Sequence, residues 1–259
     1  MSDHVHHFGM GIWLLFLAYI VSVSGSVVGL ACTRCSAAAP DNRSRLRWLA
    51  MASIAIGGVG IWLMHFIAML GFAIPSSVVR YHLGWTIASA VLSISAVFIG
   101  LLTIGRTVHL PRLVAGGVIT GLAVAGMHYT GMWALQMQGA MAYDRTLVAL
   151  SIVIAVVAAT AALWFTLVLE SPALRFVAGL VMGVAVVGMH YTGMAAVRVT
   201  VDHAAPVPAG PEVFSFLFPV FVIGLLALAV PITAVMMASD RAGTSDGAET
   251  DARVLEPRA

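Results

Sequence analysis

Three copies of a short motif rich in histidine and methionine recur along the chain. Two copies, Met127–Met132 and Met189–Met194, both read M-H-Y-T-G-M, and the third, Met64–Met69, reads M-H-F-I-A-M. Histidine and methionine side chains both bind transition metals: thioethers favour Cu(I), and imidazoles suit copper, zinc, iron and nickel. We therefore interpret the three motifs as a candidate metal site.

Within each motif, the histidine and the second methionine are four residues apart and lie on one face of a helix. Each helix can thus offer one imidazole and one thioether to a single point. The first methionine of each motif lies about 100° away around the helix, so it is a poorer ligand for the same ion. The candidate ligands are His65 with Met69, His128 with Met132 and His190 with Met194, followed by Met64, Met127 and Met189.

The acidic residues narrow the choice of metal. All eleven Asp and Glu residues lie in expected loops, termini or the tail. Magnesium, calcium and manganese prefer oxygen ligands, so they are disfavoured, as is a di-iron carboxylate centre. Copper fits best, with zinc or haem iron as alternatives. A single Met-His pair on a membrane helix more often serves packing or a hydrogen bond, so the repetition is what favours a site.

The motifs lie in apolar segments that are long enough to cross a bilayer, which takes about 20 residues. The chain is 61% hydrophobic and 9% charged, whereas a soluble domain is about a quarter charged. We expect an all-α membrane protein in contact with the lipid bilayer, and the net charge of +2 gives no indication of nucleic-acid binding. Seven transmembrane helices are expected, at about 10–32, 48–74, 85–105, 113–137, 146–169, 173–197 and 213–237.

An internal repeat organises these segments. The three histidines are 63 and 62 residues apart, which predicts three two-helix repeats followed by a seventh helix in a membrane domain over residues 10–237. All three histidines then lie at a similar depth. Gly58, Gly121 and Gly183 each precede their histidine by seven residues, which is nearly two helical turns. Because small residues let membrane helices approach closely, the histidine face is expected to be the packed interior face.

The basic residues, all of them arginine, predict the orientation. In the seven-helix arrangement ten of the thirteen arginines fall on one side of the membrane and three on the other. The excess indicates that the N-terminus is outside and the C-terminus is in the cytoplasm, with the histidines in the outer half of the membrane. Residues 1–9 are expected to form an extracytoplasmic leader. Residues 238–259 are polar and lack an apolar face, so we expect a disordered cytoplasmic tail.

Two smaller features have less specific interpretations. Cys32 and Cys35 form a lone C-x-x-C at the end of the first helix, where two small residues are favoured over a metal or redox site. At the N-terminus, loss of Met1 would leave a free amine with His4 at the third position, an arrangement that suits square-planar Cu(II). A polar leader with incidental histidines is the favoured alternative.

The repeated M-H-Y-T-G-M string, the seven spans and the two-helix repeat resemble the bacterial MHYT domain over roughly residues 8–237. The resemblance implies a sensor domain of the bacterial cytoplasmic (inner) membrane that binds copper through the nine methionines and histidines named above. It also implies oxygen, carbon monoxide or nitric oxide as the signal. Members of that family are often fused to cyclic-di-GMP enzymes or histidine kinases. Because only a short tail follows the last helix, we expect a stand-alone version that signals through a separate protein.

Other functions remain open beside a sensor. A membrane oxidoreductase or hydrolase would use the metal catalytically, but a hydrolase usually needs a carboxylate base, for which only Asp144 and Asp202 lie near. A transporter would need ligands at several depths, whereas these form a single layer. A haem protein would use two of the histidines as axial ligands. We favour the sensor and leave catalytic activity open.

Overall fold

The protein is described from a computed structural model that covers residues 11–74 and 77–255. The predicted all-α membrane fold is confirmed: this part of the chain contains seven helices long and apolar enough to span a membrane. The leader and His4 lie outside the described residues. The helices are α1 (Trp13–Ala37), a continuous helix made of α2 (Asn42–Ser53), η1 (Ile54–Leu63) and α3 (Met64–Met69), then α4 (Leu83–Ile104), α5 (Leu110–Ala134), α6 (Arg145–Val168), α7 (Pro172–Ala195) and α8 (Val213–Leu255).

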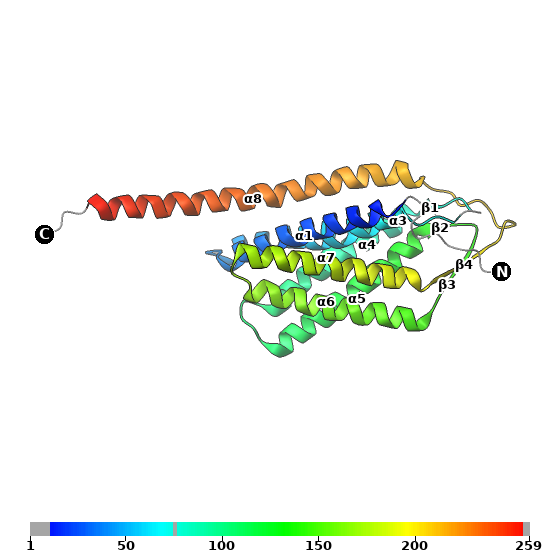
Figure 1. Ribbon diagram of the computed structural model, residues 1–259, viewed down its shortest axis with the longest axis horizontal. Coiled ribbons are helices and arrows are strands. Elements are labelled where there is room, and N and C mark those ends of the chain that lie inside the picture. The colour runs from blue at the N-terminus through cyan, green and yellow to red at the C-terminus, as the bar shows by residue number, and fades with distance from the viewer. Residues whose placement is uncertain (1–10, 75–76, 256–259) are drawn as a thin grey trace.

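Six of the spans pack into a closed ring, and the seventh lies outside it. Around the ring, α1 packs on η1, η1 on α4, α4 on α5, α5 on α6, α6 on α7, and α7 on α1 again. Helix α8 packs against α1 and η1 and extends well beyond the bundle at its C-terminal end (Figure 1). The span α2–η1–α3 is the most buried of the seven, whereas α6 and the membrane-spanning part of α8 are the least buried.

Polar residues and prolines define where several helices begin. The Asp144 carboxylate accepts hydrogen bonds from the backbone N–H groups of Thr146 and Leu147 at the start of α6. Asp41 accepts one from the Ser44 N–H group at the start of α2. These caps satisfy N–H groups that have no partner within the helix. Helices α5 and α7 begin with a proline in the first turn, where its fixed φ angle suits the helix.

Two small antiparallel sheets, which the sequence analysis did not predict, lie at one end of the bundle (Figure 1). Strand β1 (Arg80–Tyr81) pairs with β2 (Leu135–Gln136), and β3 (Gly139–Tyr143) pairs with β4 (Val197–Val201). The strands belong to the segments that follow α3, α5 and α7. They therefore tie together the C-terminal ends of the three helices that contain the histidines.

The second span changes from α-helix to π-helix over η1, just before the first histidine motif. A π-turn holds more residues than an α-turn, because its hydrogen bonds join residues five apart. The residues before His65 that face the neighbouring helix are therefore shifted along the sequence relative to a regular α-helix. An added Cβ atom at Gly57 would lie 2.8 Å from the Ser93 carbonyl oxygen, whereas one at Gly58 would meet only the Ile94 side chain, at 3.5 Å.

The prediction that the repeated glycine lies at a close helix contact is therefore confirmed in two repeats and wrong in the first. Gly121 lies against the backbone of α6 at Val156, and Gly183 lies against α1 at Val23. In the first repeat Gly57 takes this place instead of Gly58, because η1 adds about one residue between the glycine and the histidine.

Helix α8 continues as helical backbone to Leu255, whereas the polar composition of residues 238–259 predicts a disordered tail. The stretch extends a helix that has already formed in the membrane, so no new nucleus is required.

Candidate metal centre

The three motif histidines meet inside the bundle, near the end that carries the strands. The Nδ1 atom of His65 lies 3.0 Å from Nδ1 of His190 and 3.2 Å from Nδ1 of His128. One ligand atom from each ring lies within 4.8 Å of those of the other two. The ring centroids are 4.9 to 5.1 Å apart and the ring planes nearly perpendicular, so the three histidines form an almost symmetric triangle. All three side chains are buried.

Protons alone do not easily satisfy all the ring nitrogens of these three histidines. A neutral imidazole has one N–H donor and one bare nitrogen acceptor. In His65 and His128 the other ring nitrogen, Nε2, is buried without a hydrogen-bond partner. Protons on two adjacent Nδ1 atoms would face one another, so each contact can be a hydrogen bond only where one of its two Nδ1 atoms is bare. A cation at the meeting point of the three Nδ1 lone pairs would satisfy all three atoms and leave the protons on Nε2.

The orientation of the rings is fixed by packing against small residues of the next motif. An added Cβ atom at Gly131 of α5 would lie 2.5 Å from the His65 Nε2 atom, and one at Gly193 of α7 would collide with His128 Nε2. The corresponding position of the first motif is Ala68, which is buried. Each of these glycines follows its own histidine by three residues. The glycine of M-H-Y-T-G-M therefore makes room for the histidine of a neighbouring helix, a role that the sequence analysis missed.

An aromatic ring packs edge-on against each histidine. Phe66, Tyr129 and Tyr191 lie 4.9 to 5.0 Å from their preceding histidines, measured between ring centroids. Their planes are close to perpendicular to those of the histidines. The Tyr129 hydroxyl points away to Ser151 of α6, 2.7 Å distant. The ring, rather than the phenol group, is the feature common to the three motifs, which explains how phenylalanine serves in the first copy.

The six candidate methionines lie in three buried clusters. Met69, Met132 and Met194 belong to one buried cluster, together with Tyr81 and residues of the strands. They follow the histidines and lie on the strand side of them. The methionines that precede the histidines are buried elsewhere: Met127 and Met189 in a second cluster and Met64 in a third. The second methionine of each motif is therefore the one that the fold gathers into a single cluster.

Other candidate groups are occupied elsewhere. Within the described residues, the group of three histidines contains no carboxylate or thiolate. Asp144 caps α6 and forms an ion pair with Arg198, which together lower the pKa of its carboxyl group. Asp202 accepts a hydrogen bond from the Ala204 N–H group. Cys32 is buried in the core and Cys35 half-buried, and both are free thiols.

Residues 58–117 and 121–179 match the model of the MHYT family, described as the bacterial signalling protein N-terminal repeat. The chain contains MHYT repeats. The matched ranges include His65 and His128, and the motif around His190, just beyond them, is identical in sequence to that around His128. The predicted recognition of this family is thereby confirmed.

Proteins similar to the chain are bacterial signalling proteins. The chain is 44% identical over 162 residues to the bifunctional diguanylate cyclase/cyclic di-GMP phosphodiesterase MucR of Pseudomonas aeruginosa, covering 60% of the chain and 23% of MucR. It is 32% identical over 217 residues to the signaling protein YkoW of Bacillus subtilis, covering 81% of the chain and 26% of YkoW. The chain thus spans about a quarter of these relatives. No solved structure gives a significant match.

The MHYT repeats together with the seven apolar helices identify the chain as a multi-pass membrane protein with a domain of bacterial signalling proteins. Each range matched by the family model starts within one histidine helix and ends early in the next histidine helix, α5 or α7. Each matched repeat therefore contains one histidine motif and the helix that follows it, α4 or α6.

Proposed function

We propose that His65, His128 and His190 hold a copper ion and that this centre senses a diatomic gas or the redox state. The observation that supports the proposal best is the approach of three buried Nδ1 atoms to 3.0 and 3.2 Å. Bound copper would supply a centre that binds such a gas or changes oxidation state. Three histidine ligands leave a further coordination position open.

The neighbouring side chains favour copper over zinc. Met69, Met132 and Met194, each four residues after its histidine, share one buried cluster, and thioether ligands select Cu(I). Zinc also accepts three histidines, usually with a carboxylate or water as the next ligand. A haem would require two histidines on opposite faces of a macrocycle, whereas these nitrogen atoms are in contact with one another.

Helix α8 is the element best placed to pass a change at the centre to a partner protein. Gly224 of α8 lies directly against Leu63, two residues before His65 in the same span. Leu228 and Val235 extend this packing along α8, and after them α8 leaves the bundle and continues to Leu255 (Figure 1). A movement of the His65 helix would therefore displace a helix that reaches out of the membrane domain. A separate signalling protein that binds this part of α8 completes the proposed function.

The proposal is tested by metal analysis of the purified full chain beside two triple variants. One replaces His65, His128 and His190 with alanine, and the control replaces His82, His109 and His203, which lie outside the site. We expect equimolar copper in the wild type and the control and none in the first variant. Copper that is equal in all three proteins would contradict the site, and zinc or a haem absorbance band would contradict the choice of metal.

Signal binding is tested on the copper-loaded protein. Carbon monoxide added to the reduced form is expected to give an infrared band of bound CO, and the His65/His128/His190 variant is expected to give none. A copper-loaded wild type that gives no spectral change with CO, NO or oxygen would contradict gas sensing while leaving the metal site intact.

A further inference from the structure

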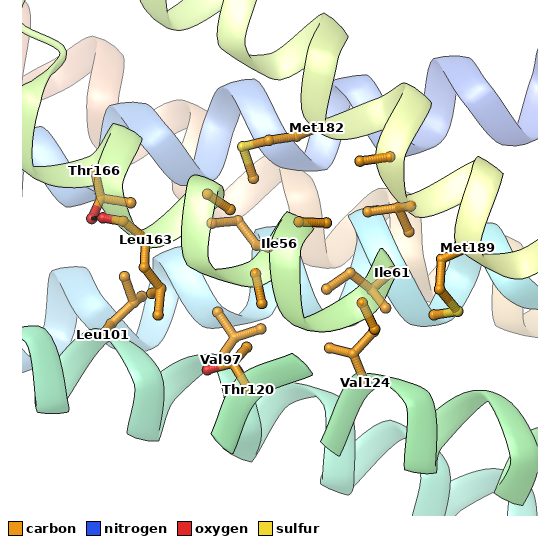
Figure 2. A pocket seen from close by; sticks show the side chains of 16 residues that line it. Ile56, Ile61, Val97, Leu101, Thr120, Val124, Leu163, Thr166, Met182 and Met189 are labelled. Carbon is orange, nitrogen blue, oxygen red and sulfur yellow. Dashed lines mark hydrogen bonds between the residues drawn. The ribbon is translucent and has the colours of Figure 1, made fainter. Parts of the chain in front are cut away.

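An apolar cavity lies in the bundle on the side of the histidines away from the strands. It has a volume of about 60 Å³ and lies between η1, α4, α5, α6 and α7. Figure 2 shows the side chains that surround it, with Ile61, Val124 and Met189 toward one end and Leu101 and Thr166 toward the other. One water molecule needs roughly 10–15 Å³ of such space, so there is room for a small molecule.

The three histidine helices contribute equivalent residues to this cavity. Ile61, Val124 and Val186 each precede their motif histidine by four residues and all line it. Four residues along an α-helix correspond to about 6 Å, so these side chains lie one turn from the metal centre. Met189, which lines the cavity as well, is adjacent to His190. The cavity therefore reaches the layer directly next to the histidines.

The next set of lining residues also follows the repeat. Thr120 and Met182 precede their histidines by eight residues, and Ile56 precedes His65 by nine. The extra residue in the first repeat falls within η1. Ile56 and Ile61 are five apart and line the same cavity, as expected for two residues one π-turn apart. The π-helix thus keeps the first repeat in register with the others around the cavity.

The chemistry of the lining disfavours water. Apart from two threonines, every lining side chain is aliphatic, alanine or methionine. The Thr120 hydroxyl donates to the Ala96 carbonyl group, and the Thr166 hydroxyl donates to that of Leu163. A buried water needs two to four polar partners, and cavities without them stay dry and bind xenon or small hydrocarbons.

The cavity borders the least covered helix of the ring. Ala158, Ala159 and Ala162 of α6 line it and are only half-buried. Their short side chains leave the space between α6 and the histidine helices unfilled, and α6 faces lipid with its other side. A small apolar molecule dissolved in the hydrocarbon can reach this position without first entering water.

We propose that this cavity binds a small apolar molecule of the size of a diatomic gas, one helical turn from the three histidines. The role of the cavity in holding the sensed gas rests on the proposed function. Its ability to take up such a molecule does not require the metal.

The test uses xenon as the probe and the metal-free full chain in lipid nanodiscs, with methyl groups labelled for NMR. We expect xenon to shift the methyl signals of Ile61, Val124 and Val186 along a saturating curve. Ala158→Leu, which fills the cavity, is expected to abolish these shifts, and Ala162→Leu serves as a second filling variant. Ala161→Leu is the matched control, since Ala161 lies on α6 but lines a separate outer groove; its shifts are expected to equal those of the wild type.

The outcomes separate this proposal from the metal site. Absence of saturable shifts in the wild type, or equal shifts in the wild type and both filling variants, overturns the cavity proposal whatever the copper content. Contact between water and these methyl groups, seen as a nuclear Overhauser effect, also overturns it. Saturable xenon shifts that the filling variants abolish support it, even where metal analysis contradicts the copper site.

Discussion

Each motif combines a candidate metal ligand with packing groups. The histidine turns its Nδ1 atom toward the other two histidines, and the aromatic residue packs on its ring. In two of the motifs the glycine three residues later receives the histidine of another helix. In many metal sites the second nitrogen of a histidine donates to an acceptor that orients the ring. Here the Nε2 atoms of His65 and His128 have no such partner, so ring orientation depends on close contact with small residues.

Gly131→Ala and Gly193→Ala should therefore weaken metal binding. The new methyl group meets the ring of His65 or His128, which cannot move away without turning its Nδ1 atom out of the triangle. Loss of an orienting contact typically lowers metal affinity by about 10- to 100-fold. Gly188→Ala is the control, because an added Cβ atom there has no neighbour within 4 Å. Competition with a Cu(I) chelator gives the affinities, and values equal to the control would contradict the packing role.

Tyr129→Phe should leave copper binding unchanged and cost about 1 kcal/mol of unfolding free energy. The phenyl ring still packs on His128, as Phe66 does on His65. Only the hydrogen bond to Ser151 is lost, and the Ser151 hydroxyl keeps its own bond to the Val148 carbonyl group. Copper content and SDS titration in mixed micelles measure the two effects. A loss of copper in Tyr129→Phe would indicate instead that the phenol group takes part in metal binding.

Among the three helices that contain the histidine motifs, the second span is the irregular one, because it contains η1. Its π-helical part η1 packs mainly against α1, α4 and α8. Gly25 of α1 lies against the backbone of Ala55 and Gly60 in this part. Such close backbone contact is typical of small residues in membrane helices. The irregular turn thus lies where three helices meet, next to the histidine motif.

Neighbouring glycines in η1 allow a matched comparison. Gly57→Ala should destabilise the protein by about 1 to 3 kcal/mol, because its methyl group meets the backbone of α4 at Ser93 and Ile94. Gly58→Ala should be neutral or stabilise it by about 0.5 kcal/mol, since it only restricts the unfolded chain. SDS titration in mixed micelles gives both free energies. The opposite order would indicate a regular α-helix with Gly58 at the contact, as the repeat spacing alone predicts.

Sequence reasoning predicted the features that follow from length and spacing, and missed those that follow from packing. The seven spans depend on apolar length, and the histidine triangle depends on the 63- and 62-residue periods, so both were predictable. The alternating valines of V-R-V-T-V indicate a strand over Val197–Val201, although this pattern was overlooked between two apolar helices. The π-turn, the role of Gly131 and the cavity depend on contacts between helices that no single segment specifies.

The molecule as a whole has two chemically different ends. One end carries the strands, with Arg80, Arg145 and Arg198, and the histidines lie near it. The other end carries most of the arginines and the exit of α8. From the positive-inside rule we expect the arginine-rich end in the cytoplasm. Under the proposed function, a gas or metal would then reach the histidines from the outer side or from the lipid, and α8 would carry the response toward the cytoplasm.

This orientation can be tested with single cysteines in a variant in which Cys32 and Cys35 are replaced by serine. Ala38→Cys introduces an exposed thiol at the arginine-rich end, and His203→Cys introduces one at the strand end. In intact spheroplasts a membrane-impermeant maleimide should label only the His203→Cys protein, because the other thiol faces the cytoplasm. After lysis both should react, which controls for accessibility. Labelling of Ala38→Cys alone before lysis would reverse the orientation and place the histidines nearer the cytoplasm.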